Sequence, residues 1–147
     1  MFNGLNKVNS KTDLILIHDA VRPFINPVLV SCIINAGKKY KAAILGVKIK
    51  ATVKESNSDL MVNKTLDRDS LWEIQTPQVF DRRLILKAYK SFPRLKVTDD
   101  SMLVEKLGVK VKIVPGSYSN IKITTWEDVI IAKAILNRIK FQEKYAA

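Results

Sequence analysis

Cysteine and long apolar runs are scarce in this sequence. Cys32 is the only cysteine among 147 residues, which excludes an internal disulfide and a cysteine-based metal site. No apolar run approaches the roughly 20 residues that a membrane-spanning helix needs, so we expect no membrane partner. Residues 1–10 contain asparagines and a glycine where a signal peptide would be apolar. These absences predict a cytoplasmic protein, in which Cys32 is a small buried hydrophobe.

Glycine is also scarce, and its spacing is informative. The five glycines are Gly4, Gly37, Gly46, Gly108 and Gly116, and no two of them form a G-x-G pair. The sequence therefore lacks a Gly-rich loop of the kind that cradles phosphates with backbone amides.

Acidic residues are outnumbered, and the formal net charge is +11. A charge of this size is compatible with nucleic acid, an anionic surface or small anionic substrates. The lysines are nevertheless spread along the chain, without a long basic run or interleaved aromatic residues. We therefore expect a solvated basic surface and no nucleic-acid partner.

The length predicts a single domain over residues 1–147. Residues 14–17 are continuously apolar, which is typical of a strand buried on both faces of a parallel sheet. Asn26 and Pro27 have the pattern of a helix start, and residues 42–47 predict a second buried strand. Strand, helix and strand in this order predict an α/β fold with a mostly parallel sheet and flanking helices.

Residues 47–54 alternate between apolar and polar side chains, which predicts a strand with one wet face. A polar turn at 55–59 and a returning strand at 60–66 complete a projecting β-arm over about residues 48–68. A two-stranded ribbon alone in water is marginally stable. We therefore expect the arm to pack on a partner, most economically a second copy of the chain.

The second half of the chain contains several helix signals. Pro77 excludes a helix interior there and favours an extended Thr76. Asp81 is predicted to cap a helix, and Thr98 to cap the next one. Gly108 should end that helix, and a strand should follow over 109–114. Thr125 and Asp128 resemble a capping box before a last helix.

Four clusters of polar residues follow these elements. The residues at the tip of the first strand are Asp19 and Arg22, where a carboxylate can hold a divalent metal and a guanidinium can clamp phosphate. From spacing alone, a cap of the next turn for Asp19 and a surface ion pair for Arg22 are equally open. The four clusters are residues 18–24, residues 67–78, residues 98–100 with Glu105, and residues 120–124 with 127–128.

Taken in this order, the clusters resemble the methylerythritol-phosphate cytidylyltransferase family, and also the related ribitol-phosphate cytidylyltransferases. The resemblance extends from about residue 3 to the C-terminus. It implies a Rossmann-like fold of the nucleotide-diphospho-sugar transferase type with a projecting β-arm. It also implies cytidylyl transfer from CTP to an alditol phosphate, assisted by Mg²⁺ or another divalent cation and carried out by a homodimer.

The resemblance implies roles for single residues. Asp19, with Ala20, would hold the metal and the substrates, and Arg22 would contact the substrate side of the cleft. Lys122 would offer a point charge to the CTP phosphates from a turn buried by its flanking isoleucines, although it could be one more solvated lysine. Thr98 would line the site, a role that is compatible with a plain helix cap. We assign His18 a structural role.

The implied arm residues are Thr52 and Arg68, followed by Thr76. In the family the arms of two subunits embrace, and arm residues complete the partner's alditol-phosphate site. Arg68 would then act across the dimer, bidentate on phosphate. The alternative is an ion pair of Arg68 with Asp67 or Asp69.

Two departures from the family pattern lower the expected activity. The family begins with a strand and a Gly-rich basic loop, which this sequence lacks, so we expect an N-terminally truncated chain without the first strands and with weak CTP binding. Ser119 stands where the family often has an acidic residue, which leaves Asp19 as the expected metal ligand. The predicted activity is methylerythritol-phosphate cytidylyl transfer, with ribitol 5-phosphate transfer or a non-catalytic dimerising module as alternatives.

Overall fold

A four-stranded mixed sheet forms the centre of the protein in a computed structural model that describes residues 2–145. Its spatial order is β1 (Leu14–Ile17), β5 (Trp72–Asp81), β2 (Ala42–Lys48) and β6 (Lys112–Pro115). β5 is antiparallel to β1 and β2, whereas β6 is parallel to β2. Three strands therefore run in one direction against β5. This sheet with its flanking helices confirms the predicted α/β fold class.

β1 forms where the apolar run predicts it, but its surroundings differ from the prediction. It pairs antiparallel with β5 and is an edge strand among the described residues. Leu16 is 40% exposed, while Ile15 and Ile17 are buried. The prediction of a parallel strand buried on both faces was wrong because β5 lies between β1 and β2. An apolar run does not show which strand will lie beside it.

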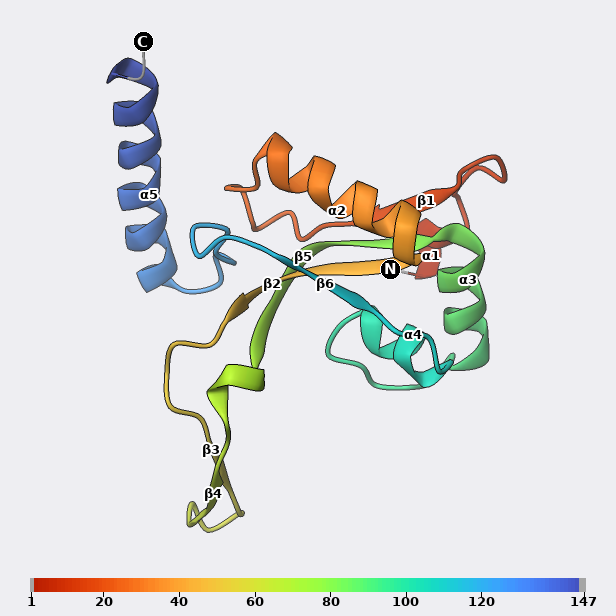
Figure 1. Cartoon of the computed structure of the whole chain (residues 1–147), viewed down its shortest axis with the longest axis horizontal. Helices are drawn as coiled ribbons and strands as arrows, with labels where there is room; N and C mark the ends of the chain where they lie inside the picture. Colours follow the sequence, from red (N-terminus) through yellow and green to blue (C-terminus); the bar gives the residue numbers. More distant parts are fainter. Residues whose placement is uncertain (1, 146–147) are drawn as a thin grey trace.

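Helices cover both faces of the sheet, as Figure 1 shows. α2 (Pro27–Tyr40) packs on one face, while α1 (Phe2–Leu5), α3 (Arg82–Ser91) and α4 (Ser101–Lys106) pack on the other. The predicted caps are confirmed, because Asn26 accepts a hydrogen bond from the Leu29 amide at 2.8 Å and Asp81 from the Leu84 amide at 3.0 Å. The polypeptide thus enters each helix at a fixed angle.

Cys32 is exposed on α2, so its prediction as a buried residue was wrong. Ile33 and Gly37 face the sheet instead, four residues apart on one side of the helix. Cys32 precedes Ile33 and is therefore rotated by about 100° around the helix axis, away from the buried stripe.

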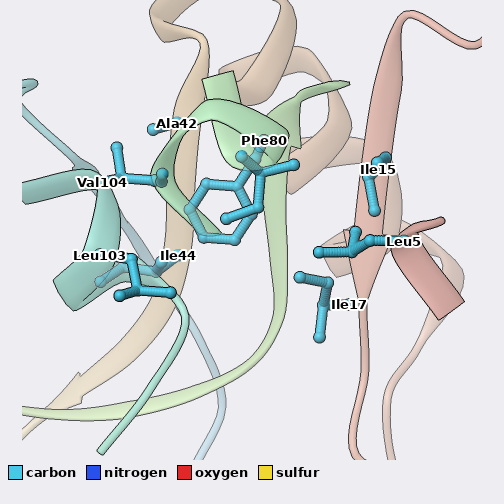
Figure 2. Close-up of a cluster of buried hydrophobic side chains, with 10 residues drawn as sticks. Leu5, Ile15, Ile17, Ala42, Ile44, Phe80, Leu103 and Val104 are labelled. Carbon is cyan, nitrogen blue, oxygen red and sulfur yellow. The ribbon is translucent and has the colours of Figure 1, made fainter. Parts of the chain in front are cut away.

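The larger of the two apolar clusters is centred on Phe80 of β5, which is fully buried. Figure 2 shows Phe80 between Ile44 and Val104 on one side and Ile15 and Ile17 on the other. Burial of such a side chain stabilises the fold by roughly 1.5–3 kcal/mol. This cluster fixes β1 against β5, and so positions the loop that follows β1.

β5 is the longest strand and contains Pro77, which sequence reasoning placed only in an extended connection. Proline lacks the N–H that a central strand must donate, so it occurs mainly at bulges and edges. The register of β2 against β5 shifts between Ile44 and Leu45, which pair with Gln78 and Gln75, so that Thr76 and Pro77 bulge out of the ladder. The Thr76–Pro77 peptide bond is cis. The bulge turns Thr76 out of the regular pairing, next to the end of β1.

A second, two-stranded sheet consists of β3 (Lys54–Ser56) and β4 (Val62–Thr65), within the predicted arm. It projects away from the central sheet, and the 3₁₀ turn η1 (Arg68–Ser70) leads back to β5 (Figure 1). The predicted continuous strand over residues 47–54 was wrong, since β2 ends at Lys48 and β3 begins only at Lys54. Alternation alone does not show that a paired neighbour exists.

α5 (Trp126–Tyr145) is the last helix and projects from the body (Figure 1). The predicted capping box is confirmed, because the Asp128 amide donates to Thr125 Oγ1 at 3.3 Å and the Thr125 amide to Asp128 Oδ2 at 2.8 Å. Large apolar side chains of α5 are exposed: Trp126, Ile130, Ile131, Leu136 and Phe141. Within residues 2–145, no helix has the length and apolar character required to cross a bilayer.

Candidate active site

A cavity of about 740 Å³ lies where β1, the β5 bulge and the start of α4 meet. It contains five of the residues that the sequence proposed for the site, namely Asp19, Arg22, Thr76, Thr98 and Lys122. These residues come from four separate segments of the chain. The fold therefore brings the strand-tip cluster together with parts of the three later clusters.

Asp19 lines this cavity and contacts two cationic side chains. Its Oδ2 atom is 3.1 Å from Lys122 Nζ and 3.3 Å from Arg22 Nε. Burial opposes ionisation, but the hydrogen bonds and charges of Lys122 and Arg22 outweigh it and hold the pKa of Asp19 below its ordinary value. Asp19 is therefore an ionised carboxylate at neutral pH, with a side chain still 32% exposed.

Arg22 is buried, at 8% exposure, and its hydrogen bonds connect two loops. Its Nη1 donates to the carbonyl oxygen of Asn120 at 2.8 Å, and its backbone amide donates to the Asp19 carbonyl at 3.0 Å. Of the alternatives left open by spacing, the ion pair with Asp19 is present, but at a buried position rather than on the surface. Contact of Arg22 with a substrate stays a prediction.

His18 and Thr76 link the end of β1 to the β5 bulge. The Asp19 amide donates to Thr76 Oγ1 at 2.9 Å, and the same oxygen lies 3.0 Å from His18 Nδ1. The other ring nitrogen, Nε2, lies 3.1 Å from the Arg22 carbonyl oxygen. His18 therefore bridges Thr76 and Arg22, which agrees with the structural role predicted for it.

Asn120 and Gln75 are two buried polar residues whose importance sequence reasoning missed. Asn120 is fully buried, and its Nδ2 donates to the Thr76 carbonyl at 2.9 Å. Gln75 is 3% exposed and donates to the Ser117 carbonyl at 2.9 Å. Asn120 belongs to the cluster at residues 120–124, in which the sequence assigned a role only to Lys122. Only the fold shows that this asparagine, rather than Ile121 or Ile123, enters the interior.

Lys122 is exposed, and Ile121 and Ile123 are only partly buried, so the predicted buried turn was too strong an expectation. The turn is instead held by hydrogen bonds, including one from the Ile123 amide to the Val21 carbonyl at 2.9 Å. Among the described contacts, the exposed Lys122 side chain has one ion-pair partner, Asp19.

The side of the cavity around α4 is acidic. The prediction that Thr98 caps this helix was wrong. α4 begins at Ser101, and Asp99 rather than Thr98 accepts the Met102 amide, at 3.1 Å. Thr98 lines the cavity without capping the helix. Asp99 Oδ2 also accepts hydrogen bonds from Gln78 Nε2 at 2.9 Å and Ser101 Oγ at 2.8 Å. The Asp99 side chain thus accepts hydrogen bonds from the first turn of α4 and from Gln78 of the sheet at the same time.

Asp100 is the second carboxylate of this wall. The Tyr89 hydroxyl donates to its Oδ1 atom. Burial, followed by the charge of neighbouring Asp99, raises the pKa of Asp100, although the Tyr89 bond acts in the opposite direction. Burial and the bond to Asp100 also raise the pKa of Tyr89. The cavity therefore has a cationic side around Lys122 and Arg22 and an acidic side around α4.

The arm residues Thr52 and Arg68 do not line this cavity. They line a separate hollow of about 280 Å³ in the arm, where Arg68 Nη1 donates to the Lys50 carbonyl at 3.1 Å. Among the described contacts, Arg68 makes no ion pair with Asp67 or Asp69, so that alternative is not found. Ala20 is exposed in the turn after β1 and is not among the cavity-lining residues.

Residues 1–138 match the family model described as IspD, 2-C-methyl-D-erythritol 4-phosphate cytidylyltransferase. The chain belongs to this cytidylyltransferase family. It is 47% identical over 138 residues to the 2-C-methyl-D-erythritol 4-phosphate cytidylyltransferase of Syntrophus aciditrophicus, covering 92% of this chain and 59% of that protein. It is 43% identical over 140 residues to that of Caldanaerobacter subterraneus subsp. tengcongensis, covering 94% and 62%.

Solved structures of the family agree. The 4-diphosphocytidyl-2C-methyl-D-erythritol synthase of Anaerococcus prevotii superposes with a TM-score of 0.87 at 47% identity, covering 92% of this chain and 62% of that one. The Thermus thermophilus cytidylyltransferase gives a TM-score of 0.80 at 29% identity, covering 89% and 64%. The chain thus spans about three fifths of the length of the curated relatives that it matches.

The family's cytidylyl transfer points to Mg²⁺ or another divalent cation, and the residues present can anchor one. Among residues 2–145, no group of three or more histidine, cysteine, aspartate or glutamate side chains is arranged to hold a metal ion. Both cationic contacts of Asp19 go to Oδ2, which leaves Oδ1 for a metal. Since Mg²⁺ is commonly held by one or two carboxylates with substrate phosphates and water, Asp19 fits as its single protein ligand.

Proposed function

We propose that these 147 residues form the acceptor-binding and metal-anchoring part of a 2-C-methyl-D-erythritol 4-phosphate cytidylyltransferase. The observation that carries this proposal is the single cavity that Asp19, Thr76, Thr98 and Lys122 line. An oxygen of the acceptor phosphate forms a bond to the α-phosphorus of CTP. The bond from that phosphorus to the bridging oxygen of pyrophosphate breaks, and pyrophosphate leaves.

Positioning and charge supply most of the catalysis in such a transfer. In this proposal the exposed Lys122 Nζ exchanges Asp19 for an oxygen of the acceptor phosphate when substrate enters, rather than for an oxygen of the CTP phosphates that the resemblance implies. Arg22 holds Asp19 in place through their ion pair, and Arg22 is itself fixed by its hydrogen bond to the Asn120 carbonyl. Mg²⁺ bound at Asp19 would draw negative charge from the triphosphate; Thr76 and Thr98 line the acceptor side.

The part of this site that would bind the CTP triphosphate is expected to have low affinity. No G-x-G segment occurs within the 147 residues, so few backbone amides are available to cradle phosphates. We therefore expect weak CTP binding and slow turnover, while the acceptor side retains its geometry.

The arm completes the site of a second copy in this proposal. Thr52 and Arg68 lie around a hollow away from the cavity of their own chain, and Arg68 keeps exposed donors. A homodimer in which the arms exchange would bring Arg68 to the partner's acceptor phosphate. The basic residues are dispersed over the sequence, so we propose no nucleic-acid partner. The proposed location is the cytoplasm, where CTP is available.

Titration calorimetry with 2-C-methyl-D-erythritol 4-phosphate in the presence of Mg²⁺ tests the acceptor site. We expect saturable binding that K122A weakens by about 10- to 100-fold, since a charge-assisted bond to phosphate contributes roughly 1.5–3 kcal/mol. K133A, which removes an exposed lysine of α5, is the matched control and should bind normally. Absence of saturable binding contradicts the proposal, and tighter binding of ribitol 5-phosphate assigns the site to that acceptor.

Subunit mixing tests the proposed dimer through pyrophosphate release. D19N removes the metal anchor of one site, and R68A removes the arm contribution to the other. Each variant alone should be inactive, but an equal mixture should regain about a quarter of the activity, because half of the dimers are mixed and each holds one intact site. No recovery in the mixture would mean that Arg68 acts within its own chain.

A further inference from the structure

The hydrogen bonds around Thr76 form a closed circuit of four residues, in which three of the four bonds involve a backbone carbonyl. Thr76 Oγ1 meets His18 Nδ1, His18 Nε2 meets the Arg22 carbonyl, Arg22 Nη1 donates to the Asn120 carbonyl, and Asn120 Nδ2 donates to the Thr76 carbonyl. The two bonds of His18 share one imidazole ring, so the direction of one of them constrains the other.

The Arg22 carbonyl fixes the direction of this circuit. A carbonyl oxygen can only accept a hydrogen bond, so the His18 Nε2 atom, 3.1 Å away, carries the proton of the neutral ring. Nδ1 of the same ring is then unprotonated and can only accept. The Thr76 hydroxyl must therefore donate its proton to His18 Nδ1 across 3.0 Å.

Thr76 is left with one free hydrogen-bonding position. A hydroxyl has one proton and two lone pairs. The proton goes to His18, and the Asp19 amide occupies one lone pair at 2.9 Å. Thr76 lines the cavity, so the remaining lone pair is left for a group that enters it. This lone pair can accept a hydrogen bond from a hydroxyl, but it repels a phosphate oxygen that carries no proton.

We infer that His18 is a positioning residue that makes Thr76 a receptor for a hydroxyl group of the acceptor substrate rather than for its phosphate. This inference rests on the proposed function for the identity of the acceptor. The phosphate is directed to the cations at Lys122 and to the arm, and the polyol end to Thr76 and the acidic side of the cavity. His18 thereby sets the direction in which the acceptor lies.

The tautomer of His18 tests the first step without any substrate. His18 is the only histidine in the sequence, so long-range ¹H–¹⁵N correlation spectra of the imidazole give one set of signals. At about pH 8, where an ordinary histidine is neutral, we expect a protonated Nε2 and an unprotonated Nδ1. A protonated Nδ1, or averaging between both tautomers, overturns the inference.

Two variants separate the two bonds of His18. In H18N the side-chain oxygen can take the place of Nδ1 and still accept from Thr76, while in H18Q the amide can only replace Nε2 at the Arg22 carbonyl. We expect H18Q to weaken 2-C-methyl-D-erythritol 4-phosphate binding about three- to tenfold, as for one hydrogen bond, and H18N by less than about twofold. Equal losses in both variants would mean that His18 is only structural.

Inorganic phosphate is the control ligand because it contains no polyol. Its affinity should be unchanged by H18Q if Thr76 receives a hydroxyl. Equal weakening of phosphate and alditol phosphate assigns Thr76 to the phosphate and contradicts the inference. If the alditol phosphate binds neither the wild type nor any variant, the proposed function fails, and the tautomer alone decides the role of His18.

Discussion

The cavity beside the sheet and the hollow in the arm each contain an arginine, and the two arginines are held very differently. Arg22 is buried, and its Nε and Nη1 atoms donate to Asp19 and to the Asn120 carbonyl. Arg68 is exposed, and only the Lys50 carbonyl accepts from it among the described contacts. The comparison shows that the site is preorganised around the end of β1 and the β5 bulge, where buried hydrogen bonds hold its residues. Arg68 keeps exposed donors, which the proposed homodimer would use.

Removal of each arginine gives the largest test of this difference. R22A leaves the Asn120 carbonyl buried without its donor and Asp19 with one cation, so we expect a loss of about 2–3 kcal/mol in the free energy of unfolding. R68A should change it by less than about 0.5 kcal/mol, as is usual for exposed positions. Urea denaturation measures both values. Similar losses would show that the arm is as tightly built as the cavity.

Gly116 offers a second test, because the loop that carries Asn120 passes close to β5. A Cβ atom there would lie 2.5 Å from Gln75 Oε1, and the Gln75 amide is already bonded to the Ser117 carbonyl. G116A should therefore cost about 1–3 kcal/mol through overpacking. G4A is the matched control, since no heavy atom of the described residues lies within 4 Å of its Cβ position, apart from Gly4's own chain neighbours and helix backbone. If thermal unfolding is the same for both variants, the loop is not held as rigidly as its contacts indicate.

The pH dependence of Asp19 gives a smaller effect. Lys122 and Arg22 lower its pKa in the folded protein, so its contribution is present above the ordinary aspartate value near about 3.9 and is lost as pH falls through the lowered pKa. Since a third of the side chain is exposed, we expect less than about 1 kcal/mol between wild type and D19N at neutral pH. Urea titrations from neutral pH to about pH 2.5 should show the two proteins converging. A constant difference would exclude the charge as its cause.

Asp100 should give the smallest effect, with the opposite sign. Burial raises its pKa, so the folded state is penalised above that pKa and the penalty disappears below the ordinary value. D100N keeps an acceptor for the Tyr89 hydroxyl but removes the buried charge. We expect its melting temperature to rise by at most a few degrees at neutral pH and to equal the wild-type value below about pH 4. A fall at neutral pH would show that the carboxylate charge itself is needed.

The sequence predicted the elements of this fold better than their neighbours. Asn26, Asp81 and the Thr125–Asp128 box act as caps as expected, because capping depends on residues within one helical turn. The antiparallel partner of Leu14–Ile17 could not be predicted, since pairing joins residues more than sixty positions apart. Asp99 rather than Thr98 accepts the Met102 amide, and Asp99 is also bonded to Gln78 of β5, a contact that the local sequence does not reveal.

The site shows the same division. Asp19, Thr76 and Lys122 were found through the resemblance of their clusters, and the fold places them around one cavity. Asn120 and Gln75 were missed because their value lies in buried hydrogen bonds to distant backbone groups, which leave no periodic signal in the sequence. The separation of Thr52 and Arg68 from that cavity likewise depends on the direction in which the arm projects.

The bonds that close the site span long stretches of chain. The Asp19 amide reaches Thr76 across 57 positions, and the Arg22 guanidinium reaches the Asn120 carbonyl across 98. Contacts of such separation carry a large loop-closure entropy and form only when most of the chain is already in place. We therefore expect the site to form together with the central sheet and not ahead of it. The Asp19 amide should consequently exchange its hydrogen with solvent together with the central sheet, which makes it a reporter of global unfolding in the loop that the protein would use for chemistry.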